Sequence, residues 1–102
     1  MRISDSSGKV FGELDSLPGC SQIVVSHAVF CVEPGKGYGQ SAHQERIQTM
    51  KALGYNYALC TVVHQNDAQI KILEKNGWKR LDFFSSSKTG NLVYLYGKTI
   101  YD

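Results

Sequence analysis

Three side chains in the sequence are of types that move protons near neutral pH: His27, His64 and Tyr94. An imidazole titrates near neutrality and can act as a general base, and a phenol can donate a proton. Each also has a structural interpretation. His27 lies in an apolar run and would then be a hydrogen-bonded core histidine, His64 a loop residue, and Tyr94 a packing residue of a strand.

A second candidate site is the glycine turn Gly35-Lys36-Gly37-Tyr38-Gly39, which separates an apolar run from a helical pattern. Backbone N–H groups in such a turn can converge on an anion, and a helix N-terminus adds partial positive charge. The turn therefore predicts a diphosphate cradle, with a tight turn that only needs permissive φ angles as the alternative.

The segment Gly37 to Ala42 also fits the dinucleotide-binding pattern GxGxxA. That site needs an acidic residue at the end of the next strand, whereas the strand here ends in Val63-His64-Gln65-Asn66. A phosphate loop of the GxxxxGK[ST] type does not occur. Dinucleotide binding thus stays the weaker alternative for this turn.

The elements that must position these residues follow from hydrophobic periodicity and turn signals. The pattern predicts strands over Lys9–Leu14, Ser21–Val32, Tyr57–Val63, Trp78–Phe84 and Asn91–Lys98, and helices over Gln40–Leu53 and from Asn66 to about Asn76. A strand, a helix and a strand in succession predict that the second and third strands are parallel neighbours.

Capping signals fix the ends of both predicted helices. Asn66 is a good N-cap, with Gln69 at the third helical position. Gly54 and Gly77 are expected to end the helices in the left-handed conformation, each followed by an aromatic residue that folds back on the last turn. The aromatic residues are Tyr55 and Trp78.

Length and composition limit the class of protein. The 102 residues predict one domain spanning 1–102, and 42% hydrophobic with 20% charged residues is typical of a globular chain. The net charge of +2 is scattered, which argues against a nucleic-acid groove. Three cysteines without a CxxC pair, and no apolar signal or membrane-spanning run, favour a reduced cytoplasmic protein.

Two blocks of sequence resemble the GNAT family of N-acetyltransferases. Val29 to Gly39 is similar to that family's fourth strand and pyrophosphate loop, [QR]xxGx[GA], and Asn66 to Trp78 to its Asn-led helix that ends in Gly and an aromatic residue. The resemblance covers about Gln22 to Lys98. It implies an α+β fold of the three-layer α/β type: a mixed, mostly antiparallel sheet with a splayed parallel central pair and two main helices.

The resemblance also implies where acetyl-CoA would bind. Pantetheine would lie between the splayed strands, against the main chain of Val29 and Cys31, and the Asn66 side chain would be available to it. The diphosphate would rest on the amides of Gly35, Lys36, Gly37, Tyr38, Gly39 and Gln40. No metal is expected.

Three departures from the family pattern bear on activity. Pro34 replaces the Arg or Gln that opens the loop motif, which removes a side chain and an N–H. Leu73 stands where many members carry the tyrosine that protonates the leaving thiolate. The family's first strand and two N-terminal helices, which shape the acceptor site, have no counterpart before Lys9.

The expected function is acetyl transfer from acetyl-CoA to a primary amine, by direct attack. His27, on the same strand face as Val29, is the first candidate base, with His64 and Tyr94 as further proton-transfer candidates. An open acceptor side suits a protein or peptide amine, and an uncovered strand edge suggests a homodimer. The alternative is a non-catalytic GNAT-like module that binds CoA or a protein partner.

Overall fold

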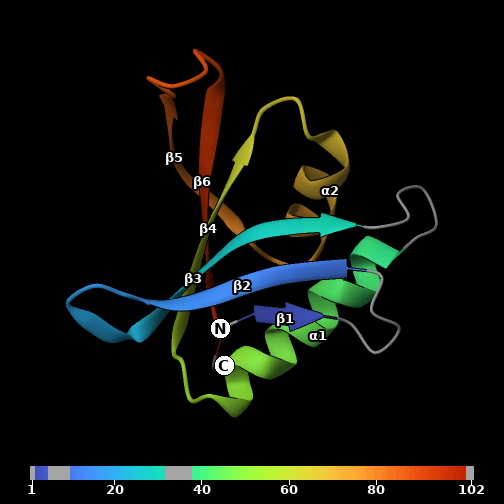
Figure 1. Cartoon of the computed structure of the whole chain (residues 1–102), viewed down its shortest axis with the longest axis vertical. Coiled ribbons are helices and arrows are strands. Elements are labelled where there is room, and N and C mark those ends of the chain that lie inside the picture. Colours follow the sequence, from blue (N-terminus) through green and yellow to red (C-terminus); the bar gives the residue numbers. More distant parts are fainter. Residues whose placement is uncertain (1, 5–9, 32–37, 101–102) are drawn as a thin grey trace.

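The structure is a computed structural model that describes residues 2–4, 10–31 and 38–100; Figure 1 shows its course. The strands are β1 (Arg2–Ser4), β2 (Val10–Leu17), β3 (Cys20–Cys31), β4 (Tyr57–Val63), β5 (Lys79–Ser85) and β6 (Leu92–Thr99). The helices are α1 (Tyr38–Ala52) and α2 (Asp67–Lys75). Every predicted element is present, with ends that differ by up to three residues from the predicted ones.

The described strands form one mixed sheet in the order β1-β2-β3-β4-β6-β5. Only β3 and β4 pair in parallel among these strands, and all other neighbours are antiparallel. The α1 helix connects the parallel pair, as βαβ connectivity requires. The predicted parallel pair inside a mostly antiparallel sheet is therefore confirmed.

Both helices end as the sequence predicts. Gly54 has φ of 85° and Gly77 has φ of 88°, in the left-handed region that favours glycine. The N–H of Tyr55 donates to Met50 O at 3.2 Å, and the N–H of Trp78 donates to Leu73 O at 3.0 Å. These are the long bonds of Schellman endings, and they turn both aromatic residues back toward the preceding helix.

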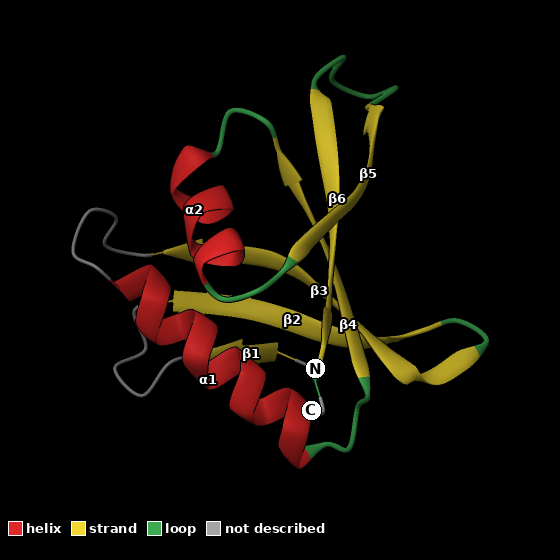
Figure 2. Ribbon diagram, turned by 180° about the vertical axis from the view of Figure 1, so that it is seen from behind, coloured by secondary structure: helices red, strands yellow, loops and turns green. Residues whose placement is uncertain are grey.

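One hydrophobic core lies between the sheet and the two helices, which cover the same face (Figure 2). It joins Met50 of α1 and Leu73 of α2 to strand residues and to Trp78. The other face carries no helix in the described residues, so this part of the chain has two of the three expected layers. None of the described helices is long and apolar enough to cross a membrane.

Two differences from the predicted elements concern the end of β2 and the end of α1. β2 extends to Leu17 instead of ending at Leu14, because it pairs with β3 as far as Cys20. Leu53, predicted as the last residue of the first helix, lies beyond the end of α1, and its exposed fraction is 50%. From residue 43 onward, where the side chains of α1 are described, the buried positions are His43, Arg46 and Met50.

Candidate functional site

The parallel strands β3 and β4 part from each other halfway along β3. They pair from Ile23 with Tyr57 to Ser26 with Cys60, and the described residues show no pairing beyond that point. Afterwards β3 follows β2, while β4 continues along β6 to Val63. Figure 1 shows the two strand ends pointing apart. The predicted splay is therefore present, with Ser26 and Cys60 at its vertex.

Val29 and Cys31 lie in the part of β3 beyond this vertex. Neither residue pairs with β4 in the described part of the chain. Tyr38, Gly39 and Gln40 form the first turn of α1, where backbone N–H groups are left without helical partners. The remaining cradle positions, Gly35, Lys36 and Gly37, lie outside the described residues.

His27 is the first residue of β3 past the vertex, and it faces away from the helices. Its cross-strand partner is Glu13, and Asp15 pairs with the neighbouring Val25, so both acids share its face. His27 Nε2 is 2.8 Å from Asp15 Oδ2 and 3.9 Å from Glu13 Oε2. The histidine side chain is 43% exposed, so the alternative of a core histidine is wrong.

The carboxylate of Asp15 determines which nitrogen of His27 could accept a proton. An ionised carboxylate only accepts hydrogen bonds, so Nε2–H must be the donor and the lone pair must lie on Nδ1. The hydrogen bond from His27 lowers the pKa of Asp15 below its usual value, which keeps the acid ionised. This His–Asp arrangement is suited to general-base chemistry.

Glu13, Asp15 and His27 also bring one possible ligand atom each within 4.8 Å of one another. Two carboxylates and an imidazole are a donor set that could hold a divalent ion. All three side chains are at least partly exposed, and exposed acidic groups commonly gather without a metal.

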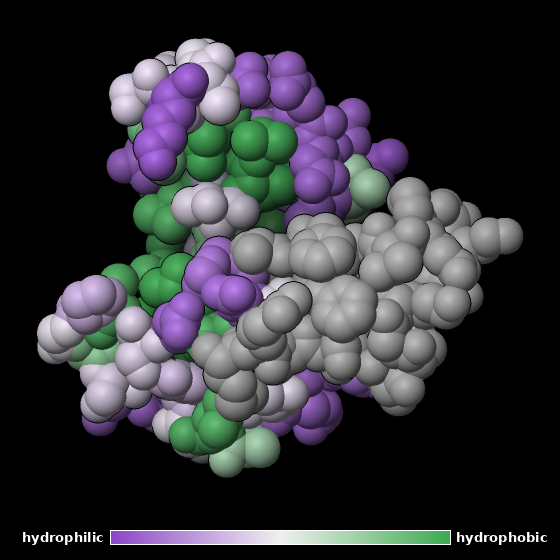
Figure 3. Space-filling view, in the orientation of Figure 1, coloured by the Kyte–Doolittle hydropathy of each residue, from purple (hydrophilic) through white to green (hydrophobic). Residues whose placement is uncertain are grey.

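The surface around His27 combines charge with apolar side chains. Figure 3 shows the sheet face opposite the helices, where hydrophobic side chains lie next to hydrophilic ones. Val25 and Leu59 pair across the strands on this face and are half-buried. This face therefore combines an acidic pair with apolar side chains.

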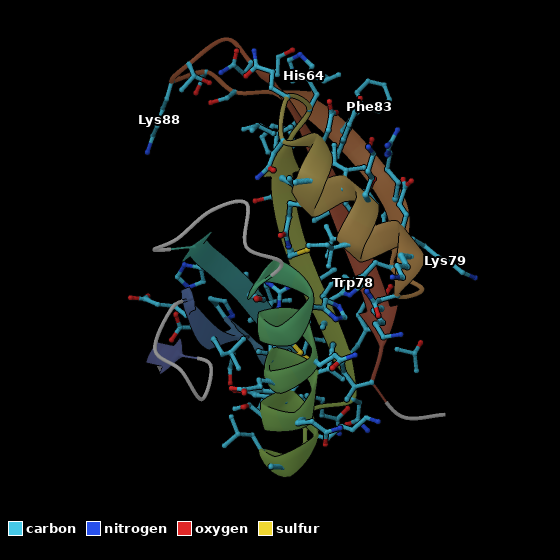
Figure 4. The ribbon with its side chains drawn as sticks, turned by 90° about the vertical axis from the view of Figure 1, so that its right-hand side faces the viewer. His64, Trp78, Lys79, Phe83 and Lys88 are labelled. Carbon is cyan, nitrogen blue, oxygen red and sulfur yellow. The ribbon has the colours of Figure 1, made fainter. Side chains whose placement is uncertain are left out.

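Asn66 and His64 follow β4 at the start of α2. Asn66 Oδ1 accepts the N–H of Gln69 at 3.2 Å, which confirms the predicted N-cap. His64 is exposed, and its Nδ1 lies 3.2 Å from the carbonyl oxygen of Leu92 in β6. Figure 4 shows His64 near the outer end of the sheet, far from Trp78. His64 is thus held on the β6 side of β4, away from β3.

Tyr94 lies on the helix-covered face, because it pairs with Val62, a core residue. The Arg80 guanidinium carbon is 3.8 Å from the centre of the Tyr94 ring. Arg80 and Glu74 also bind the hydroxyl of Tyr96, at 3.0 and 2.8 Å. Tyr94 therefore belongs to a network that joins α2, β5 and β6, and the structure does not bring it together with His27.

A buried polar cluster under α1 was missed by the sequence analysis. The indole N–H of Trp78 donates to His43 Nε2 at 2.7 Å, and Arg46 Nη1 donates to Ser26 Oγ at 3.1 Å. Trp78 lies between α1 and the strands in Figure 4. Only the spacing of His43 and Arg46 relative to Met50, on one helix face, could have indicated their burial.

The electrostatics of this cluster follow from its burial. Desolvation, with smaller contributions from Arg46 and Lys98, lowers the pKa of His43 to about 4. Burial raises the pKa of the Cys60 thiol to about 11. Both groups are therefore neutral at physiological pH, which leaves Arg46 as the charged member of the buried cluster.

Leu73 is fully buried in the core formed with Cys60 and Trp78. A leucine has no proton to give, so the position that resembles the family's acid supplies none. Away from the splay, an open groove of about 730 Å³ runs along α1 and is bordered by Lys51, Asn76 and Lys98. It contains none of the site residues predicted from the sequence.

The same fold occurs in several solved acetyltransferase structures. A protein described as a phosphinothricin N-acetyltransferase matches with a TM-score of 0.82 and 17% identity, over 97% of this chain and 66% of that one. The yncA protein of Salmonella typhimurium, solved with its cofactor acetyl-CoA, matches with a TM-score of 0.79 and 16% identity, over 92% and 59%. The ribosomal-protein-S18-alanine N-acetyltransferase of Escherichia coli matches with a TM-score of 0.77 and 11% identity, over 98% and 68%.

No family sequence model and no curated protein sequence matches the chain. The chain spans between 59% and 68% of the length of these three proteins. Other matching structures include an acetyltransferase of the GNAT family from Bacillus anthracis, with a TM-score of 0.75. The chain therefore has the fold of the GNAT acetyltransferases.

Proposed function

We propose that this chain binds acetyl-CoA between the diverging ends of β3 and β4 and transfers the acetyl group to a primary amine of a protein or peptide. The observation that carries the proposal is the end of parallel pairing at Ser26 and Cys60. Past that vertex, β3 offers main-chain groups to a ligand and leads toward the N-terminus of α1. A relative with this fold was solved with acetyl-CoA.

The described residues suit the two ends of such a ligand. The first turn of α1 would receive the diphosphate with its N–H groups and partial positive charge. The amides of Gly35, Lys36 and Gly37 would complete this cradle. Asn66 uses only Oδ1 for its cap, so its side-chain N–H groups can donate to the pantetheine arm.

The acetyl thioester supplies the electrophilic carbon, and His27 would supply the base. The neutral amine attacks the carbonyl carbon, its proton passes to His27 Nδ1, and the C–S bond breaks with its electron pair going to sulfur. Asp15 would hold the imidazole in the required tautomer. A main-chain N–H near Val29 would polarise the carbonyl.

The sheet face that carries His27 supports the choice of acceptor. Glu13 and Asp15 would attract an ammonium group, and the adjoining apolar side chains would contact the residues next to it. A face without a covering helix in the described residues suits a macromolecular amine better than a small molecule, which needs an enclosing pocket.

A second candidate is a non-catalytic module that binds CoA. It is favoured by one observation, the complete burial of Leu73 where an acid would be needed. Steady-state release of CoA thiol in the presence of peptide amines separates the two functions. Turnover supports the enzyme, and tight binding without turnover supports the module.

The assay can also test His27 directly. His27→Ala should lower turnover and leave the affinity for acetyl-CoA unchanged, and Asp15→Asn should lower turnover by disturbing the tautomer. His64→Ala is the matched control. A His27→Ala variant with the parental rate would place the base elsewhere.

A further inference from the structure

Arg46 is a buried cation without a carboxylate partner in the described part of the chain. Its exposed fraction is 3%, its Nη1 donates to Ser26, and its Nε has no hydrogen-bond partner. None of the ion pairs among the described residues involves it. A guanidinium stays charged, and a buried charge costs several kcal/mol unless an anion compensates it. The position is therefore suited to an anion.

The place of Arg46 in the fold indicates which anion this is. Its partner Ser26 pairs with Cys60, and these two residues form the vertex at which β3 and β4 part. The guanidinium carbon also lies 5.8 Å from the ring centre of Trp78. The main-chain N–H of Trp78 donates to the main-chain carbonyl of Leu73, the residue that stands where an acid would meet the leaving thiolate.

We propose that Arg46 stabilises the thiolate of CoA as it leaves, and so replaces by charge the proton donor that Leu73 cannot be. The proposal rests on the proposed function. When the C–S bond breaks, its electron pair stays on sulfur, Arg46 keeps all its protons, and the amine proton is taken by His27. No general acid is then required, because a thiolate beside a cation is a good leaving group.

Two ionisable groups beside Arg46, His43 and Cys60, do not titrate in the range where this effect can be measured. His43, on the same helix, has a pKa lowered to about 4 by burial, and Cys60 on β4 has one raised to about 11 by burial. Lys98 on β6 is the further cation that acts on His43. A free thiol has a pKa near 8.5, which lies inside the measured range of about pH 6 to 9. A change in affinity over that range that CoA shows and an analogue without the sulfur does not show therefore reports on the ligand thiol.

The test compares CoA with dethio-CoA, which lacks the sulfur, by calorimetric titration from about pH 6 to 9. If binding lowers the pKa of the CoA thiol by one unit or more, the affinity for CoA should rise about tenfold across this pH range. The pH dependence of the affinity for dethio-CoA should be the same in the parent and in every arginine variant. Arg46→Met should abolish the excess rise, and Arg46→Lys should keep part of it. Arg80→Met, which removes an exposed arginine on β5, should behave as the parent.

Three results would overturn the proposal. Identical pH profiles for CoA and dethio-CoA in the unmodified protein would mean that no thiolate is stabilised, even if Arg46→Met does not fold. A preference of tenfold or more for succinyl-CoA over acetyl-CoA, lost in Arg46→Lys, would assign Arg46 to an acyl carboxylate. If neither CoA nor acetyl-CoA binds at any pH, the proposed function itself fails. In the first case it stands, and in the second case succinyl-CoA replaces acetyl-CoA as the acyl donor.

Discussion

The histidine buried under α1 should make the protein sensitive to mild acid. His43 Nε2 accepts the indole N–H of Trp78 at 2.7 Å, and an indole can only donate. His43 therefore carries its proton on Nδ1 in the folded state. A second proton on Nε2 would break the bond to Trp78 and place a charge in the core beside Arg46.

The size of the effect follows from the shift in pKa. Burial lowers the pKa of His43 from 6.5 to about 4, which corresponds to about 3 kcal/mol of unfolding free energy. Because the unfolded chain takes up the proton first, this contribution is complete above about pH 6.5. It falls as the pH drops toward 4 and is lost below that value.

Urea unfolding of the parent and His43→Gln at several pH values between about 4 and 7.5 measures this contribution. Gln can still accept from Trp78 but does not titrate in this range. The difference in unfolding free energy between the two proteins should be constant above pH 7 and should shrink by up to about 3 kcal/mol at pH 4. Replacing the exposed His64 by Gln is the control, and it should leave the pH dependence unchanged.

The prediction fails if parent and His43→Gln lose stability in parallel as the pH falls. That result would mean that His43 has its ordinary pKa in the folded protein, and that neither its burial nor its bond to Trp78 disfavours the charged form. Carboxylates such as Asp15 titrate in both proteins, so they cancel in the difference.

Three further outcomes are expected. Asn66→Ala should lower the unfolding free energy by about 1 kcal/mol in urea titration through loss of the α2 cap, with Asn66→Asp close to the parent. Gly97→Ala should cost about 1–3 kcal/mol, because an added Cβ would lie 2.8 Å from Leu81 Cδ1 and against the ring of Tyr57; a thermal melt equal to the parent's would show that the strands adjust freely. Acetyl-CoA should raise the Tm of the parent, and Gly39→Val should remove that rise while the variant remains folded; an undiminished rise would move the diphosphate away from α1.

Local signals explain why the elements could be predicted. These signals are the caps of α2, the glycine that ends α1 and the apolar run of β4. Each acts within a few residues, so it can be recognised from the sequence alone. The splayed pair came from the resemblance of two motifs to a family, because no local pattern shows where two strands separate.

The polar part of the core could not be predicted in the same way. His43 and Arg46 are residue types that are mostly exposed, and only tertiary contacts with Trp78 and Ser26 make their burial tolerable. The hydrogen bond between His27 and Asp15 could not be predicted from the sequence either. It depends on the register between β2 and β3, which is set across a hairpin and is not a spacing in the sequence.

The most direct test of the account is an amide NMR titration of the labelled protein with acetyl-CoA. The account predicts large shift changes for residues 27–31, for the first turn of α1 and for Asn66, and little change along β5. It also predicts slowed hydrogen exchange of the β3 amides beyond Ser26. Absence of binding, or changes gathered instead along the groove between α1, Asn76 and Lys98, would contradict it.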